Sequence, residues 1–268
     1  MLALASAPQK ITLKIMGNKI KLLDGKEYDK SELTQRMCDD DFYYGFLGNN
    51  ALSSSSIKDL LDGRYFDKTE QRDGKTQEAF KAGRLIHLAV LEPHRLKELN
   101  VAECVSKSNG LYKSLVDEAG SAEHVYTRRM VDKAEKLASI AVQNNKELFS
   151  NPGLEFELPE IGGVLGFTFR GKADMIIKDF DGCGKNVIID LKTTSRLDYF
   201  KQSAVAFSYD IQLYLYCHLF DVLPEDFYWL GLEKRTGRTE LFRGSNALYD
   251  SGREKTERAV EIYVDGIL

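Results

Sequence analysis

A series of strand-like segments after Pro152 limits the chain to folds built on a central β-sheet. Apolar and polar residues alternate over Leu154–Pro159, and Gly162-Gly163 is placed to turn the chain into a second strand. Val187–Leu191 is β-branched and mostly apolar, as the central strands of sheets are. We therefore expect strands at 154–159, 164–169, 172–177, 187–191 and 227–232, with a short edge strand at 239–243.

Helical periodicity flanks these strands. A run of serines is suited to cap one helix, and Pro93 ends another in which apolar residues recur at helical spacing. The expected helices are 53–61, 76–92, 123–149, 197–220 and 247–268. In chain order, the expected helices come before a meander of strands, and further helices lie among and after the later strands. This order predicts an α/β or α+β fold whose mixed central sheet is covered by helices.

Residues 1–50 are expected to form an N-terminal appendage to a single domain over residues 51–268. Ile11–Ile15 alternates, Gly17-Asn18 is suited to a turn, and Ile20–Leu22 continues the alternation, which predicts a short hairpin. The first residues lack the basic flank and long apolar core of a secretory signal. Nothing in this segment predicts catalysis.

Composition excludes several classes of protein. The chain has 268 residues with 37 Lys and Arg against 41 Asp and Glu, so its formal net charge is −4. That sign excludes a generally basic nucleic-acid coat, and any DNA would have to bind at a local patch. No apolar run approaches the ~20 residues of a membrane span. The cysteines lack metal-binding spacing and indicate free thiols in a reducing cytoplasm; they are Cys38, Cys104, Cys183 and Cys217.

Two aspartates and a lysine lie at the ends of the apolar strands. Asp190 and Lys192 are two residues apart and share one face of their strand, and a hairpin would bring Asp174 beside Asp190. Two close carboxylates raise each other's pKa unless a cation lies between them, and a divalent metal ion would satisfy both. The plainer alternative is that Asp190 caps the next helix and Lys192 is solvated.

Phosphodiester hydrolysis is the chemistry that fits these residues. Mg²⁺ held by Asp174 and Asp190 would bind a phosphate oxygen and lower the pKa of a bound water. Lys192 would orient or deprotonate that water, or neutralise charge in the transition state.

These residues resemble the PD-(D/E)xK nuclease superfamily, in which an Asp at a strand start precedes Asp/Glu-x-Lys on an apolar strand. Here Ala173-Asp174 replaces the usual Pro-Asp. Gly83-x3-His87-x3-Leu91-Glu92-Pro93 resembles the helix upstream of the core in the RecB and RecE types, and Gln212-x3-Tyr216 resembles the motif of the helix that follows the core. Ser53–Leu61 resembles the Ser-rich helix start of these enzymes. The resemblance covers roughly residues 52–235 and is strongest to the RecE (exodeoxyribonuclease VIII) type of phage recombination exonuclease.

The resemblance implies a role for each matched residue. The metal would be held by His87, Asp174, Asp190 and the main-chain carbonyl of Leu191. The catalytic residues would be Asp174, Asp190, Lys192, Gln212 and Tyr216, with Lys192 as the catalytic lysine and the last two holding the site or the substrate backbone. Cations near the site are candidates for contacts with DNA phosphates. They are Arg84, Arg170, Lys172, Arg196 and Lys201.

The resemblance also implies an activity and its partners. It implies 5′→3′ digestion of double-stranded DNA ends with Mg²⁺, or Mn²⁺ as a substitute, leaving 3′ single strands for an annealing protein. A ring-like homo-oligomer, a trimer or tetramer, would act in the cytoplasm of a bacterial host if a phage encodes the chain. No iron–sulfur cluster is expected, because relatives that hold one have clustered cysteines downstream and none follows Cys217 here.

Three alternatives stay open. The first two are a nuclease of other polarity and an endonuclease, because the metal chemistry is the same for all of them. The third is a non-catalytic scaffold that binds DNA ends with the same fold. The intact set Asp174, Asp190 and Lys192 argues against the scaffold, because a lost activity usually removes one of the three.

Overall fold

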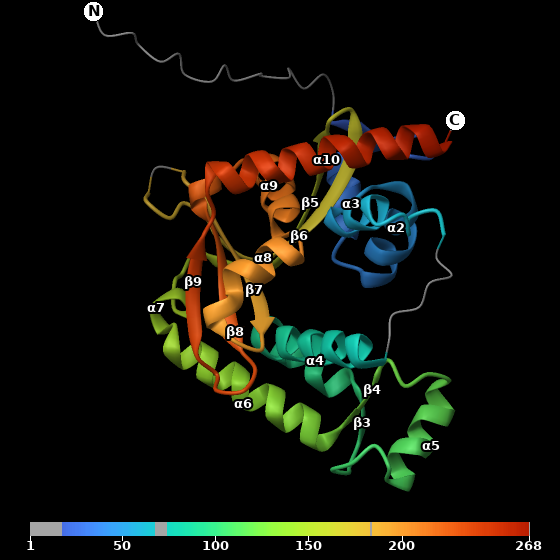
Figure 1. Ribbon diagram of the computed structural model, residues 1–268, viewed down its shortest axis with the longest axis vertical. Coiled ribbons are helices and arrows are strands. Elements are labelled where there is room, and N and C mark those ends of the chain that lie inside the picture. The colour runs from blue at the N-terminus through green and yellow to red at the C-terminus, as the bar shows by residue number, and fades with distance from the viewer. Residues whose placement is uncertain (1–17, 68–73, 183, 268) are drawn as a thin grey trace, which may run out of the picture.

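A five-stranded mixed sheet lies at the centre of the computed structural model, which describes residues 18–67, 74–182 and 184–267 (Figure 1). Its strands lie side by side in chain order: β5 (Leu154–Val164), β6 (Phe167–Ile177), β7 (Val187–Thr194), β8 (Phe227–Glu233) and β9 (Thr239–Arg243). β7 and β8 are parallel, and every other neighbouring pair is antiparallel. The α/β class with a mixed, helix-flanked sheet is confirmed.

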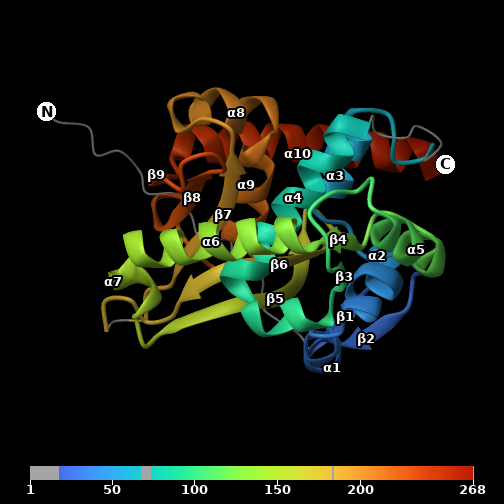
Figure 2. The ribbon, with the colours of Figure 1, turned by 90° about the horizontal axis from the view of Figure 1, so that it is seen from below.

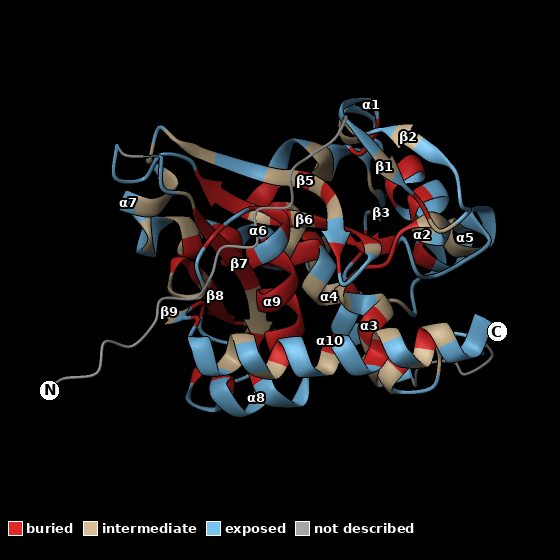
Figure 3. Ribbon diagram, turned by 90° about the horizontal axis from the view of Figure 1, so that it is seen from above, coloured by how far each residue is buried: buried red, intermediate tan, exposed pale blue. Residues whose placement is uncertain are grey.

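Helices cover both faces of this sheet (Figures 1 and 2). The elements on one side are α3 (Ser54–Leu61), α8 (Phe200–Ala206), α9 (Tyr209–Leu219) and α10 (Asn246–Ile267). Those on the other are α4 (Gly74–Leu91), α6 (Arg128–Asn144) and α7 (Lys146–Phe149). Burial concentrates in the sheet and in α9, which is enclosed between the sheet and α10 (Figure 3). Among the helices of the described residues, none has the length and apolar character to cross a membrane.

The central strand β7 divides its side chains between two hydrophobic cores. Ile188 packs in the core under α9 and α10, whereas Ile189 and Leu191 pack in the core under α4 and α6. Asp190 and Lys192 therefore take the α9 side, as the two-residue period of a strand predicts. Val187–Leu191 of β7 is buried, which explains why this part of the strand is mostly apolar.

The hairpin between β5 and β6 differs from the expectation. Two long strands replace three short ones, and the turn lies at Leu165-Gly166, where both residues have positive φ angles of 51° and 82°. Gly162-Gly163 remains in β5, paired with Phe169 and Thr168. A Cβ at Gly162 would lie 3.2 Å from Leu219 of α9, so this glycine serves helix packing and not a turn.

Two expected helices are interrupted. The segment 197–220 forms the 3₁₀ turn η3 (Leu197–Tyr199), α8 and α9, with a break at Ser208, whose φ of 49° is left-handed. The segment 123–149 begins with β4 (Val125–Thr127), whose last residue caps α6 by accepting a hydrogen bond from Met130 N. The helices expected at 53–61, 76–92 and 247–268 appear as α3, α4 and α10, with bounds that differ by at most two residues among those described.

Small elements extend the α4–α6 side of the molecule. The 3₁₀ helix η2 (Pro93–Glu98) leads from α4 to β3 (Asn100–Ala102), which pairs in parallel with β4. α5 (Gly110–Ala119) packs on this pair through Tyr112, which is buried with Val125. A further 3₁₀ turn, η4 (Pro224–Asp226), leads into β8.

Residues 18–50 pack against β5 and β6. They form β1 (Lys19–Lys21), β2 (Glu27–Asp29), α1 (Lys30–Arg36), the π-helix η1 (Asp41–Phe46) and α2 (Leu47–Asn50). Their apolar side chains share a small core with Ile161 of β5. Ile20 pairs with Tyr28 in an antiparallel β1–β2 hairpin, and the expected partner strand, Ile11–Ile15, lies outside the described residues.

Candidate active site

The two candidate carboxylates lie where β6 and β7 diverge. The β6–β7 ladder ends at Met175 and Ile189, so Asp174 and Asp190 occupy the next position, beyond the ladder. There the Leu191 N–H donates to Asp174 Oδ2 at 2.8 Å instead of to a strand carbonyl. Asp174 therefore lies beside β7, the strand that carries Asp190, as the sequence predicts.

The first half of β6 pairs with a different partner. Leu52 N–H donates to Thr168 O at 2.9 Å, and Arg170 N–H donates to Leu52 O at 2.8 Å. Ala173 and Met175 pack into the cores on opposite sides of the sheet, although residues two apart normally share a face. The alternation of β6 therefore breaks at Asp174. Across the hairpin, Glu157 has a left-handed φ of 50°.

Asp190 is held by two polar groups and is 1% exposed. Gln212 Nε2 donates to Asp190 Oδ1 at 2.6 Å, and Lys192 Nζ lies 2.6 Å from Asp190 Oδ2. Oδ2 has no partner with good hydrogen-bond geometry in spite of this ion pair. A buried carboxylate oxygen in this state is available to a further cation.

His87 reaches the same place from α4. Its Nδ1 lies 3.5 Å from Asp174 Oδ2. One turn earlier in α4, a Cβ at Gly83 would lie 3.3 Å from Thr193 Oγ1 of β7, so glycine permits the close approach of this helix to the strand. The Gly-x3-His spacing in the sequence thus has a physical reason.

Tyr216 fixes β6 just before Asp174. Its hydroxyl donates to Lys172 O at 2.7 Å and accepts from Lys172 N–H at 3.3 Å. A Cβ at Gly171 would lie 2.9 Å from the Tyr216 ring, so the glycine makes room for it. Gln212 and Tyr216 lie on one face of α9, and each holds a strand that carries a candidate carboxylate.

Burial and charge shift the pKa values of this group. Burial, and then the nearby Asp190 charge, raise the pKa of Asp174 well above its usual range. Burial of the His87 ring, with the positive charge of Lys192, lowers its pKa to about 4, so the imidazole is neutral at pH 7 as a metal ligand must be. Burial opposes the charge of Lys192, but Asp190 and Asp174 raise the pKa of its ammonium overall.

The donor set fits a divalent cation. Two carboxylates and a neutral imidazole come from β6, β7 and α4. Beyond its ion pair with Lys192, Asp190 Oδ2 accepts no hydrogen bond of good geometry, and the raised pKa of Asp174 indicates too little positive charge at the site. Within the described ranges, no three His, Cys, Asp or Glu side chains converge tightly enough to form a ready-made metal cage. Mg²⁺ does not need such a cage, because it usually retains waters and binds substrate phosphate.

Two of the expected DNA-contacting cations are used inside the protein. Arg170 is 8% exposed, its Nε donates to Leu47 O at 3.2 Å, and its guanidinium lies over the Tyr43 ring. Lys172 pairs with Asp40 at 3.2 Å. Both cations join residues 18–50 to β6, which leaves little of either charge for DNA.

The other three expected cations face solvent. Arg84 is 51% exposed and pairs with Glu123 at 3.2 Å. Arg196, the residue before η3, and Lys201 of α8 are exposed soon after β7, and Arg196 lies over the Tyr199 ring. These positions remain available for phosphate contacts.

The sequence interpretation overlooked two groups beside Lys192. The Tyr209 ring lies under Lys192 Nζ at 5.1 Å and under Lys58 Nζ at 5.8 Å. Tyr209 precedes Gln212 by three residues, so the helical period could have placed it on the site-facing side of α9. Lys58 lies in the Ser-rich helix segment of the resemblance, but no pattern distinguished it from a solvated lysine.

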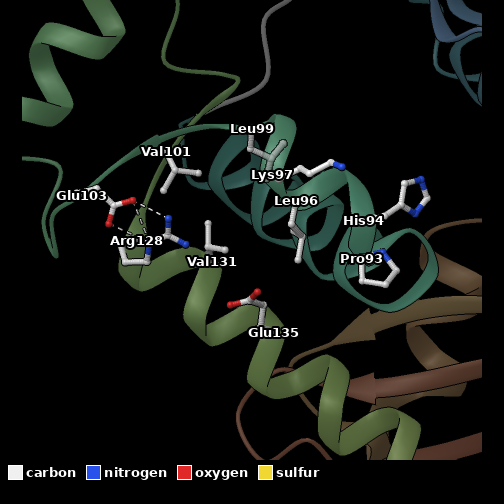
Figure 4. Close-up of a pocket in the computed structure, with 10 residues that line it drawn as sticks. All are labelled: Pro93, His94, Leu96, Lys97, Leu99, Val101, Glu103, Arg128, Val131 and Glu135. Atoms are coloured by element: carbon white, nitrogen blue, oxygen red, sulfur yellow. Dashed lines mark hydrogen bonds and ion pairs between the residues drawn. The ribbon is translucent and has the colours of Figure 1, made fainter.

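The hollow drawn in Figure 4 lies apart from these residues. It encloses about 590 Å³ between η2, β3 and α6, and an Arg128–Glu103 ion pair of 2.6 Å borders it. None of the candidate site residues lines it.

The comparisons agree with the motif and the fold. The model of the PD-(D/E)XK nuclease superfamily matches residues 53–261, and the chain belongs to this superfamily. It is therefore a nuclease by family, and such nucleases generally use divalent metal ions.

Two solved structures are similar at low identity. A protein named "Putative exonuclease" from Eubacterium rectale has 14% identity and a TM-score of 0.50, with 84% of this chain and 85% of that chain covered; it shows the fold alone. A protein named SSO0001 has 15% identity and a TM-score of 0.33, with 77% of this chain and 84% of that chain covered. No curated protein matches the sequence.

Proposed function

We propose that the protein is a metal-dependent exodeoxyribonuclease that digests ends of double-stranded DNA 5′→3′ and leaves 3′ single-stranded tails for recombination. The observation that carries the proposal is the juxtaposition of Asp174, Asp190 and Lys192 where two buried strands diverge. The metal would be Mg²⁺, with Mn²⁺ as a substitute, held by His87, Asp174, Asp190 and the Leu191 carbonyl. When bound, it would polarise the scissile phosphate and acidify a water.

The protein's own residues supply positioning and charge. Gln212 fixes Asp190 in one orientation, and the Leu191 N–H does the same for Asp174. Lys192, held by Asp190 and the face of Tyr209, would neutralise charge that develops on the phosphate. Because these side chains are already ordered by their partners, little reorganisation would be needed during reaction.

Partners and assembly belong to the same proposal. The substrate would be a duplex DNA end, and a single-strand annealing protein would take up the product strand. A ring of three or four copies in a bacterial cytoplasm, that of the host if a phage encodes the chain, would enclose the duplex. The resemblance to RecE-type enzymes supports these points.

Labelled DNA tests the activity. Purified protein is incubated with linear duplex labelled at the 5′ or the 3′ end, and with closed circular duplex, with and without Mg²⁺. We expect mononucleotides from linear DNA only, early release of the 5′ label, and complete loss of activity in EDTA.

The other outcomes separate the alternatives. Early release of the 3′ label would reverse the polarity, and cutting of closed circles would make the protein an endonuclease. Binding of DNA ends without hydrolysis in Mg²⁺ or Mn²⁺ would instead favour a scaffold.

A further inference from the structure

Lys58 of α3 lies beside the candidate site, in the Ser-rich helix segment but apart from the set of Asp174, Asp190 and Lys192. The start of α3 is fixed to the sheet, because Leu52 pairs with β6 and Ser53 and Ser56 form a capping box. Ile57 and Leu60 anchor the helix in the core under α9. The half-buried Lys58 ammonium then lies 5.8 Å from the Tyr209 ring centre, and Lys192 Nζ lies 5.1 Å from the same centre.

Neighbouring lysines have carboxylate partners, whereas the Lys58 ammonium has none among the described residues. Lys192 pairs with Asp190 at 2.6 Å, and Lys255 pairs with Asp210 at 2.7 Å. The described contacts of the Lys58 ammonium are the Tyr209 face and the longer-range charges of Lys192, Lys255, Asp190 and Asp210. Burial, and then the Lys192 charge, lower the pKa of Lys58 to about 8.

The two nearby acids are already committed. Asp190 is held by Gln212 and Lys192, and Asp210 accepts from Ser251 Oγ at 2.6 Å as well as from Lys255. Neither is placed to neutralise a second lysine. A half-buried ammonium beside another ammonium costs free energy in the unliganded protein, and an anion would remove that cost.

We propose that Lys58 is a phosphate-binding residue of the active site, and that Lys58 and Lys192 together flank a phosphodiester of the bound DNA strand across the ring of Tyr209. This inference rests on the proposed function for the identity of the ligand. It adds a second phosphate-contacting lysine, from α3, to the metal-centred group on β6, β7 and α4. Both ammoniums lie within cation–π distance of the Tyr209 ring.

The test compares wild type, Lys58→Met and Lys58→Arg, with Lys136→Met as matched control because Lys136 is an exposed lysine of α6 on the other side of the sheet. Binding of a fluorescent 20-base-pair duplex is measured in EDTA over a range of salt concentrations. Loss of one phosphate contact should reduce the slope of log K against log salt by ~0.9 in Lys58→Met. Lys58→Arg should keep the wild-type slope, and Lys136→Met should change nothing.

Hydrolysis and thermal unfolding complete the test. With Mg²⁺, Lys58→Met should lose ~10- to 100-fold in the rate of nucleotide release, as expected for one electrostatic contact, and Lys58→Arg should recover part of it. The Tm of Lys58→Met should equal or exceed that of wild type, because an uncompensated cation is removed. A merely structural lysine would instead lower the Tm and leave the salt slope unchanged.

The results separate the two proposals. Unchanged slope and rate in Lys58→Met, with an active wild type, would overturn the role of Lys58 and leave the nuclease proposal intact. A reduced slope with an inactive wild type would retain the phosphate contact and overturn the nuclease proposal. Wild-type protein that neither binds nor cuts DNA would overturn both.

Discussion

At the scale of single residues, the Asp190 carboxylate holds the Lys192 ammonium in the candidate site through an ion pair of 2.6 Å. We expect Lys192→Ala to lower the rate of DNA hydrolysis at least ~10²-fold, because one preorganised electrostatic group is lost, and Asp190→Ala to do the same. Steady-state nucleotide release measures the effect, and circular dichroism checks that both variants keep the fold. Near-normal rates in either variant would locate the active site elsewhere.

Gln212 is predicted to act through Asp190. Gln212→Ala removes the 2.6 Å hydrogen bond to a carboxylate that is 1% exposed. Leaving that oxygen unpaired should lower the free energy of unfolding by about 1–3 kcal/mol and also slow hydrolysis. Urea denaturation and nucleotide release measure the two effects, and a variant of unchanged stability would mean that water replaces the amide.

Much of the site could be predicted from the sequence, because its parts lie within regular elements. The strand period places Asp190 and Lys192 on one face, and the helical period places Gln212 and Tyr216 on another. Arg170 and Lys172 could not be assigned this way. Their partners Leu47 and Asp40 are 123 and 132 residues away in the chain, and only folding brings them together.

At the scale of elements, glycines set how closely helices approach the sheet. Gly171→Ala would place a Cβ 2.9 Å from the Tyr216 ring and 3.0 Å from Leu219. We expect about 1–3 kcal/mol of destabilisation and a slower enzyme, because Tyr216 holds β6 next to Asp174. Gly163→Ala is the control, since a Cβ there meets nothing within 4 Å. Equal stability of the two variants in urea would contradict this account.

The strand boundaries show where sequence interpretation fails. Gly162-Gly163 suggested a turn because glycine is common in turns, but one of these glycines is required by Leu219 on a distant helix. The true turn uses Leu165, a residue that rarely adopts the positive φ it has here. The break between α8 and α9 at Ser208 is similar, because a left-handed serine leaves no periodic signal in the sequence.

At the scale of the whole molecule, Asp40 ties residues 18–50 to two other regions. It pairs with Arg95 of η2 at 2.7 Å and with Lys172 of β6 at 3.2 Å. Burial alone would raise the pKa of Asp40, but these two cations hold it below the usual value of 3.8. Its stabilising contribution is therefore present above pH 3.8 and is lost as the pH falls through the lower pKa of the folded protein.

Asp40→Asn should consequently destabilise the protein in a pH-dependent way. The expected loss is about 1 kcal/mol at pH 7, since the carboxylate is partly exposed and screened, and the difference from wild type should shrink toward pH 3. Urea denaturation at both pH values measures it. A difference that grows on acidification would mean that the ion pairs do not hold this segment.

The net charge of −4 bears on how the whole protein would hold DNA. The described cations that remain exposed near the site include Arg196 and Lys201, on one side of the sheet, which is a small basic surface for a single chain. In the proposed ring, several such basic faces would surround one duplex and add their attraction for its phosphates. We therefore expect a trimer or tetramer in sedimentation equilibrium at micromolar concentration. Mutation of Lys201 to Glu should weaken DNA binding without changing the mass of the assembly. A strict monomer that still releases nucleotides processively would contradict the ring.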